Sequence, residues 1–101
     1  MFLILGHNEC KFCLKSKTYL DDNRQDYIYI DLFLKFGKDK WRDVFKTLNV
    51  SQKSIPIIYQ VNDSYNQDAD LGKIKDLHLI GTYDDLVKYV HNLEITIDDD
   101  Y

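Results

Sequence analysis

The chain has 101 residues, of which 45% are hydrophobic, four are glycine and one is proline, so it is expected to form one folded domain. Thirteen basic against seventeen acidic residues leave a net charge of −4, which argues against nucleic acid as a partner. No apolar run has the length of a membrane span and no signal peptide pattern is present, so we expect a cytoplasmic protein with no membrane partner.

The first predicted element is a strand over Phe2–Leu5, where the apolar residues do not alternate with polar ones. Such a run is typical of a strand covered on both faces. The only two cysteines, Cys10 and Cys13, follow with the spacing C-x-x-C. Lys11–Asp22 has the length and composition of a helix, although its apolar periodicity is weak. Cys10 is therefore expected at the start of a helix.

A second strand and a second helix follow. Tyr27–Leu32 is rich in β-branched and aromatic residues, which favours a strand. The clearest helical pattern has the spacing i, i+3, i+4 and i+7, and it consists of Trp41, Val44, Phe45 and Leu48. This stripe predicts a helix with one face on the core.

Two more strands are predicted at Ile57–Val61 and Leu77–Ile80. Between them, Asn62–Asp76 is polar and longer than an ordinary hairpin loop, so it is either a disordered tip or a recognition surface.

The last helix is predicted to begin at Thr82, where Asp85 three residues later resembles a capping box. Its apolar face consists of Tyr83, Leu86, Val87, Val90 and Leu93. The domain is expected to span residues 1–95, and the acidic tail 96–101 is expected to fray. The element order predicts an α/β fold, in which a four-stranded mixed sheet has helices on both faces.

The C-x-x-C pair suits thiol–disulfide exchange. At a helix start, unpaired N–H groups and the helix dipole favour a thiolate at Cys10, and Lys11 adds positive charge. Cys13, one turn further on, is expected to stay protonated until it attacks the disulfide that Cys10 forms. The position directly after a strand favours this chemistry over a pair of ordinary buried cysteines.

A structural zinc site is not expected. Such a site usually has four ligands, and only His7, His78 and His91 could complete one with the two cysteines. None of these histidines is paired at the usual spacing, so we expect no metal.

Three motifs together resemble the glutaredoxin family, particularly the short phage-encoded kind, over about residues 1–93. Cys10–Cys13 (C-K-F-C) stands where the family has C-P-Y-C, and Ser54–Pro56 (S-I-P) stands where it has T-V-P. Gly81–Leu86 (G-T-Y-D-D-L) stands where it has G-G-x-D-D-L. The resemblance implies a thioredoxin-like fold of order β-α-β-α-β-β-α, with Pro56 in the cis form beside Cys10.

The resemblance also implies a glutathione site. The backbone of Ile55 would align the cysteine of glutathione as an added strand does, and the helix start at Thr82 would hold its γ-glutamyl end. The full implied set is Phe12, Arg42, Lys53, Ile55, Pro56, Thr82, Tyr83 and Asp84. Within it, Arg42 and Lys53 would face the glycine carboxylate, and Asp84 would accept from the amino group.

This chain departs from the family pattern at three places. Lys11 replaces the usual proline, Thr82 replaces the second glycine, and His7–Glu9 stands where many members carry a lysine. Glu9 places a negative charge next to Cys10, which opposes thiolate formation.

The resemblance implies a glutathione-linked dithiol–disulfide oxidoreductase that reduces protein disulfides or glutathione mixed disulfides. It implies a monomer whose partners are glutathione and disulfide-bearing proteins, with ribonucleotide reductase as a candidate, in the host cytoplasm if phage-encoded. Two alternatives stay open. One is an iron–sulfur cluster held between two chains by the first cysteine and glutathione, and the other is a redox-inactive adaptor on the same fold.

Overall fold

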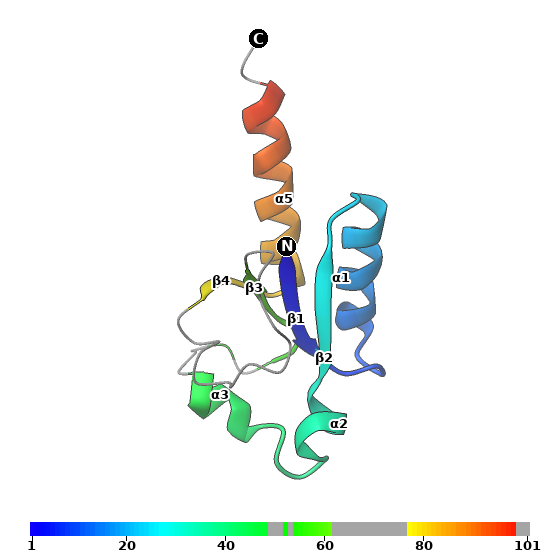
Figure 1. Ribbon diagram of the computed structural model, residues 1–101, viewed down its shortest axis with the longest axis vertical. Coiled ribbons are helices and arrows are strands. Elements are labelled where there is room, and N and C mark those ends of the chain that lie inside the picture. Colours follow the sequence, from blue (N-terminus) through cyan, green and yellow to red (C-terminus); the bar gives the residue numbers. More distant parts are fainter. Residues whose placement is uncertain (49–51, 53, 62–76, 99–101) are drawn as a thin grey trace.

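A four-stranded mixed sheet forms the centre of the protein (Figure 1). The computed structural model describes residues 1–48, 52, 54–61 and 77–98. The strands are β1 (Phe2–Gly6), β2 (Tyr27–Asp31), β3 (Ile57–Gln60) and β4 (His78–Gly81), arranged in the order β2-β1-β3-β4. β2 is parallel to β1, whereas β3 is antiparallel to β1 and β4 is antiparallel to β3. The predicted mixed sheet is confirmed.

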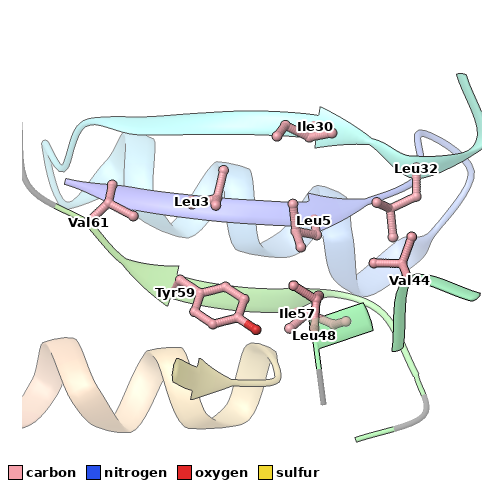
Figure 2. Packing of buried hydrophobic residues seen from close by; sticks show 9 residues of the cluster. All are labelled: Leu3, Leu5, Ile30, Leu32, Val44, Leu48, Ile57, Tyr59 and Val61. Carbon is pink, nitrogen blue, oxygen red and sulfur yellow. The ribbon is translucent and has the colours of Figure 1, made fainter. Parts of the chain in front are cut away.

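Helices cover both faces of this sheet. They are α1 (Lys11–Asp22), α2 (Leu32–Phe36), α3 (Asp43–Leu48) and α5 (Tyr83–Asp98). Leu3 and Leu5 of β1 belong to a cluster on the α3 face, and Phe2 and Ile4 belong to a second cluster with α1 and α5. Figure 2 shows the first cluster, which consists of Leu3, Leu5, Ile30, Leu32, Val44, Leu48, Ile57, Tyr59 and Val61. The unbroken apolar run of β1 is thus explained by burial on both faces.

The last helix begins as predicted. The backbone N–H of Thr82 donates to the carboxylate of Asp85 at 3.0 Å, and the Thr82 hydroxyl donates to the same oxygen at 3.1 Å. Gly81 precedes them with φ +124°, and a Cβ on it would collide with that carboxylate. A glycine is therefore required where the chain turns from β4 into α5. α5 continues to Asp98, beyond residue 95, so the domain boundary stays a prediction.

The prediction that the second strand ends at Leu32 is wrong. This residue begins the short helix α2 instead of ending a strand. The Asp31 carboxylate accepts from the N–H groups of Phe33 (2.9 Å) and Leu34 (3.1 Å), which makes it an N-cap. Gly37, with φ +93°, follows the last helical residue. Because α2 has only five residues, it is too short to produce a recognisable helical period.

The helix predicted from Trp41 onward begins two residues later, at Asp43. Trp41 lies in a turn, where its N–H donates to the carbonyl of Gly37 at 3.2 Å. Its ring contacts Phe33 (5.0 Å between centroids) and Phe45 (5.8 Å), so the apolar stripe still faces inward.

The loop predicted at 62–76 lies outside the described residues. No helix in the described part of the chain is long and apolar enough to cross a membrane.

Replacing Asp31 with alanine is expected to lower the free energy of unfolding by about 2 kcal/mol, because two helix N–H groups lose their acceptor. Urea titration measures the loss. Asp22→Ala is the matched control, since Asp22 is exposed at the end of α1, and it should change stability by less than about 0.5 kcal/mol.

The pH dependence tests the same interaction. Burial disfavours the charged form of Asp31, but hydrogen bonds from His7, Leu34 and Asn8 outweigh it and hold the Asp31 pKa below its usual value. The ionised Asp31 therefore stabilises the folded state above the unfolded-state pKa of about 4. This stabilisation is lost as the pH falls through the pKa of Asp31 in the folded state. An unchanged acid-unfolding profile in Asp31→Ala would contradict this assignment.

Candidate active site

Cys10 is the N-cap of α1. Its backbone is extended (φ −80°, ψ 118°), and its Sγ accepts a hydrogen bond from the N–H of Cys13 at 3.2 Å. Its own N–H donates to the carbonyl of His7 at 3.0 Å, which fixes the entry into the helix. The sulfur thus occupies the place of a capping oxygen, where amide N–H groups stabilise negative charge. The predicted position at a helix start is confirmed.

Cys13 has the opposite environment. Its side chain is fully buried, whereas Cys10 is partly exposed, and both are free thiols. Burial, followed by the hydrogen bond and the charge of Cys10, raises the pKa of Cys13 to about 12. The prediction that the second thiol keeps its proton at neutral pH is supported by this burial.

The Ile55–Pro56 bond is cis, as the resemblance implied. The Sγ of Cys10 lies 3.9 Å from the carbonyl oxygen of Ile55, so the two motifs meet although they are 45 residues apart in sequence. Beside them is a hollow of about 440 Å³, which we call the cis-proline pocket. It is lined by Phe12, Ser54, Ile55, Pro56, Thr82, Tyr83 and Asp84.

Six of the eight predicted glutathione-binding residues therefore line one pocket. Arg42 does not line it; the residue is exposed, and its guanidinium lies 5.3 Å from the centre of the Trp41 ring. Lys53 lies outside the described residues. The roles of Arg42 and Lys53 toward a carboxylate stay predictions.

Gly6 supports the site, although it belongs to none of the three sequence motifs. It ends β1, and a Cβ there would lie 2.5 Å from the Cys13 sulfur. Real Cβ atoms essentially never approach another atom so closely, so only glycine lets the first turn of α1 pack against the strand end. The signal was present in the sequence, since Gly6 is the one glycine near the cysteines.

Tyr29 was also missed. Its hydroxyl lies 3.4 Å from the same Cβ position and is buried without a hydrogen-bond partner among the described residues. Burial, followed by the charge on Cys13, raises its pKa above the usual value. Cys13 therefore has a neutral polar neighbour in addition to Cys10 and the backbone of His7.

His7 belongs to the segment His7–Glu9 before the cysteines, which departs from the family pattern that the sequence resembles. Its Nδ1 lies 3.2 Å from a carboxylate oxygen of Asp31, and its ring stacks on Phe33 with centroids 3.7 Å apart. The N–H of Asn8 donates to the other Asp31 oxygen at 3.3 Å. Asp31 thus connects the loop before Cys10 to the end of β2 through hydrogen bonds.

Among the described residues, no three His, Cys, Asp or Glu side chains gather closely enough to hold a metal ion.

Comparison with known proteins identifies the fold. No family model and no curated protein matches the sequence. The structure is similar to that of reduced Escherichia coli glutaredoxin, with a TM-score of 0.57 and 20% identity over 90% of this chain and 93% of that one. A glutaredoxin from Archaeoglobus fulgidus matches with a TM-score of 0.47 and 21% identity over 75% of this chain and 83% of that one. The protein therefore has the thioredoxin-like fold of glutaredoxins.

Replacing Gly6 with alanine is expected to lower the free energy of unfolding by about 1–3 kcal/mol, because the new methyl group overlaps the Cys13 sulfur. The same substitution in a Cys13→Ala background should be much less destabilising, because the sulfur is gone. Urea unfolding of the four proteins measures this coupling. Strictly additive effects would show that the contact is not the cause.

Iodoacetamide at pH 7–9 is expected to label Cys10 at least about tenfold faster than Cys13. Cys13 is fully buried, and below its pKa of about 12 it holds its proton, whereas the thiolate is the reactive form. Mass spectrometry of peptides from briefly treated protein measures both rates. Comparable labelling of the two sites in folded protein would contradict the assigned environments.

Proposed function

We propose that the protein is a glutathione-linked dithiol–disulfide oxidoreductase that reduces glutathione mixed disulfides and protein disulfides. One observation carries the proposal: the Cys10 sulfur is held at a helix N-terminus, 3.9 Å from the Ile55 carbonyl that precedes cis-Pro56, at the edge of the cis-proline pocket. A partly exposed sulfur in that place can meet a substrate disulfide, while the buried Cys13 lies one helical turn away to resolve the bond that forms.

The pocket suits the chemistry of glutathione. The backbone of Ile55 offers groups for strand-like hydrogen bonds to the central cysteine of the tripeptide. The Thr82 N–H is already donated to Asp85, so the N–H of Tyr83 is the group at the start of α5 that can donate to the γ-glutamyl carboxylate, and the exposed Asp84 can accept from its amino group. The half-exposed ring of Phe12 closes the side next to the cysteines.

For a glutathione mixed disulfide, the proposed reaction has two thiol exchanges. The Cys10 thiolate attacks the glutathione sulfur of a mixed disulfide, a Cys10–glutathione bond forms, and the substrate thiolate leaves and takes up a proton. A second glutathione thiolate then attacks the sulfur of the bound glutathione, which releases oxidised glutathione and restores Cys10.

For a protein disulfide, the Cys10 thiolate attacks one substrate sulfur and forms a mixed disulfide while the other substrate sulfur leaves as a thiolate and takes up a proton. Cys13 then gives up its proton and attacks the Cys10 sulfur of this bond, so that a Cys10–Cys13 disulfide forms and the substrate leaves as a dithiol. Two glutathione molecules reduce the Cys10–Cys13 disulfide in two further exchanges and leave as oxidised glutathione.

The proposed function also implies the partners of the protein. They are glutathione and proteins that carry an accessible disulfide, and ribonucleotide reductase is a candidate through the family resemblance. The acidic net charge of −4 supports a partner other than nucleic acid. We propose that the protein acts as a monomer in the cytoplasm.

Cys10→Ser should abolish reduction of a glutathione mixed disulfide, because no thiolate remains at the helix start. Cys13→Ser should retain a substantial part of this activity, because the second glutathione performs the release. A coupled glutathione reductase assay with a small mixed disulfide measures both variants. Equal activity in wild type and Cys10→Ser would refute the proposal, and regeneration by thioredoxin reductase but not by glutathione would refute only the glutathione link.

A further inference from the structure

The charges on α1 have the reverse of the polarity that a helix favours. Lys11 and Lys15 lie in its N-terminal half, Lys17 lies just past its middle, and Asp21 and Asp22 lie in its last turn. The first turn contains no acidic residue and the last turn contains no basic one. Because the helix dipole is positive at the N-terminus, this order is less stable than its opposite by roughly 0.3–1 kcal/mol per terminal charge. Helix stability therefore does not explain the lysines near the N-terminus of α1.

Three of these charged residues, Lys11, Lys15 and Asp22, line a groove beside the site. The groove has an open volume of about 750 Å³ and runs along α1; we call it the α1 groove. Lys11, Leu14 and Lys15 line it near the cysteines, Asp22 lines it at the far end, and Tyr83 borders it from α5. Tyr83 also lines the cis-proline pocket, so the two hollows share a wall.

The end of the α1 groove near the cysteines combines apolar surface with positive charge. The described residues include four exposed large hydrophobic side chains, and two of them belong to the first turn of α1: Leu14 (45% exposed) lines this groove, and Phe12 (50%) lines the neighbouring cis-proline pocket. The Lys15 ammonium is placed over the Phe12 ring, 5.1 Å from its centre. A protein of net charge −4 thus presents a local cationic and apolar surface next to its reactive sulfur.

We propose that the α1 groove binds an acidic, partly apolar peptide segment next to the disulfide-forming cysteine of a protein substrate. This inference rests on the proposed function, because the segment must enter together with a disulfide. With glutathione in the cis-proline pocket, the departing substrate chain lies on the Tyr83 side, where the α1 groove continues. Apolar side chains of the segment contact Leu14, and its carboxylates pair with Lys11 and Lys15.

The spacing of the charges defines the segment further. Lys11 and Lys15 are separated by four helical residues, about 6 Å along the axis, which matches acidic residues two apart in an extended peptide. Asp22 lies about 16 Å from Lys11 along the axis, or about five extended residues. Acidic residues are therefore favoured within the first four positions from the substrate cysteine and disfavoured beyond them.

Peptide–glutathione mixed disulfides test the inference. One peptide carries two aspartates two residues apart next to its cysteine, and a matched peptide carries asparagines at the same positions. The wild-type kcat/KM is expected to be about fivefold higher for the acidic peptide at low salt, and the preference should vanish at about 0.5 M salt. Equal kcat/KM values at low salt would overturn the inference while leaving the proposed function intact.

Charge-reversal variants test whether the α1 groove causes the preference for the acidic peptide. Lys15→Glu should abolish the preference for the acidic peptide, whereas Lys88→Glu, an equal charge change on the exposed surface of α5, should retain it. Lys15→Glu should also unfold at the same or a higher temperature than wild type, because it moves negative charge toward the helix N-terminus. An equal loss of preference in both variants would show an effect of net charge and overturn the assignment to the groove.

Two controls keep the test decisive. The salt dependence of the wild-type preference needs no variant, so it stands even if Lys15→Glu does not fold. If the wild type reduces neither peptide, the proposed function fails and this inference falls with it.

Discussion

The close contact between the end of β1 and the first turn of α1 is the constraint on which the site depends. Gly6 has no side chain, so the buried sulfur of Cys13 can lie against the strand end. That contact sets the position of α1 along the sheet, and with it the place of Cys10 one turn earlier. Only then does Cys10 reach the carbonyl of Ile55, two residues before β3, the strand that pairs with β1 on its other side. The sheet order β2-β1-β3 thus brings two distant motifs together.

The packing of α1 against the end of β1 also gives the two sulfurs of the C-x-x-C motif different chemistry. Cys10 lies at the cap, partly exposed, and accepts an amide hydrogen bond. Cys13 lies under the helix, where burial disfavours its thiolate and raises its pKa to about 12. In the proposed reaction, the exposed sulfur therefore attacks first. The buried one acts only when a disulfide forms next to it, since it must lose its proton in a setting that opposes the charge.

The strands, the long helices and the cluster of site residues could be predicted because their signals are local or come from motifs. The unbroken apolar run of β1, the C-x-x-C at a helix start and the Thr82–Asp85 cap are patterns within a few residues. What was missed depends on tertiary contacts. α2 is too short for periodicity and exists because Asp31 caps it, and the position of Gly6 against Cys13 arises only once β1 and α1 pack. Arg42 was assigned by motif position alone, and it lies outside the pocket.

The first turns of the two long helices carry opposite charges, and the site lies between them. α5 has Asp84 and Asp85 in its first turn, which is the arrangement that the helix dipole favours. α1 has a sulfur at its cap and Lys11 directly after it, with no acidic residue in the first turn. The cis-proline pocket lies between these two helix starts: Asp84 lines it from α5 and Phe12 lines it from α1, while Lys11 and Lys15 line the neighbouring α1 groove. Among the described residues, the charged group that lines the pocket is thus a carboxylate, and the ammonium groups lie outside it. In the proposed complex, Asp84 therefore accepts from the amino group at the γ-glutamyl end, and the sulfur of the ligand lies at the opposite helix start, toward Cys10.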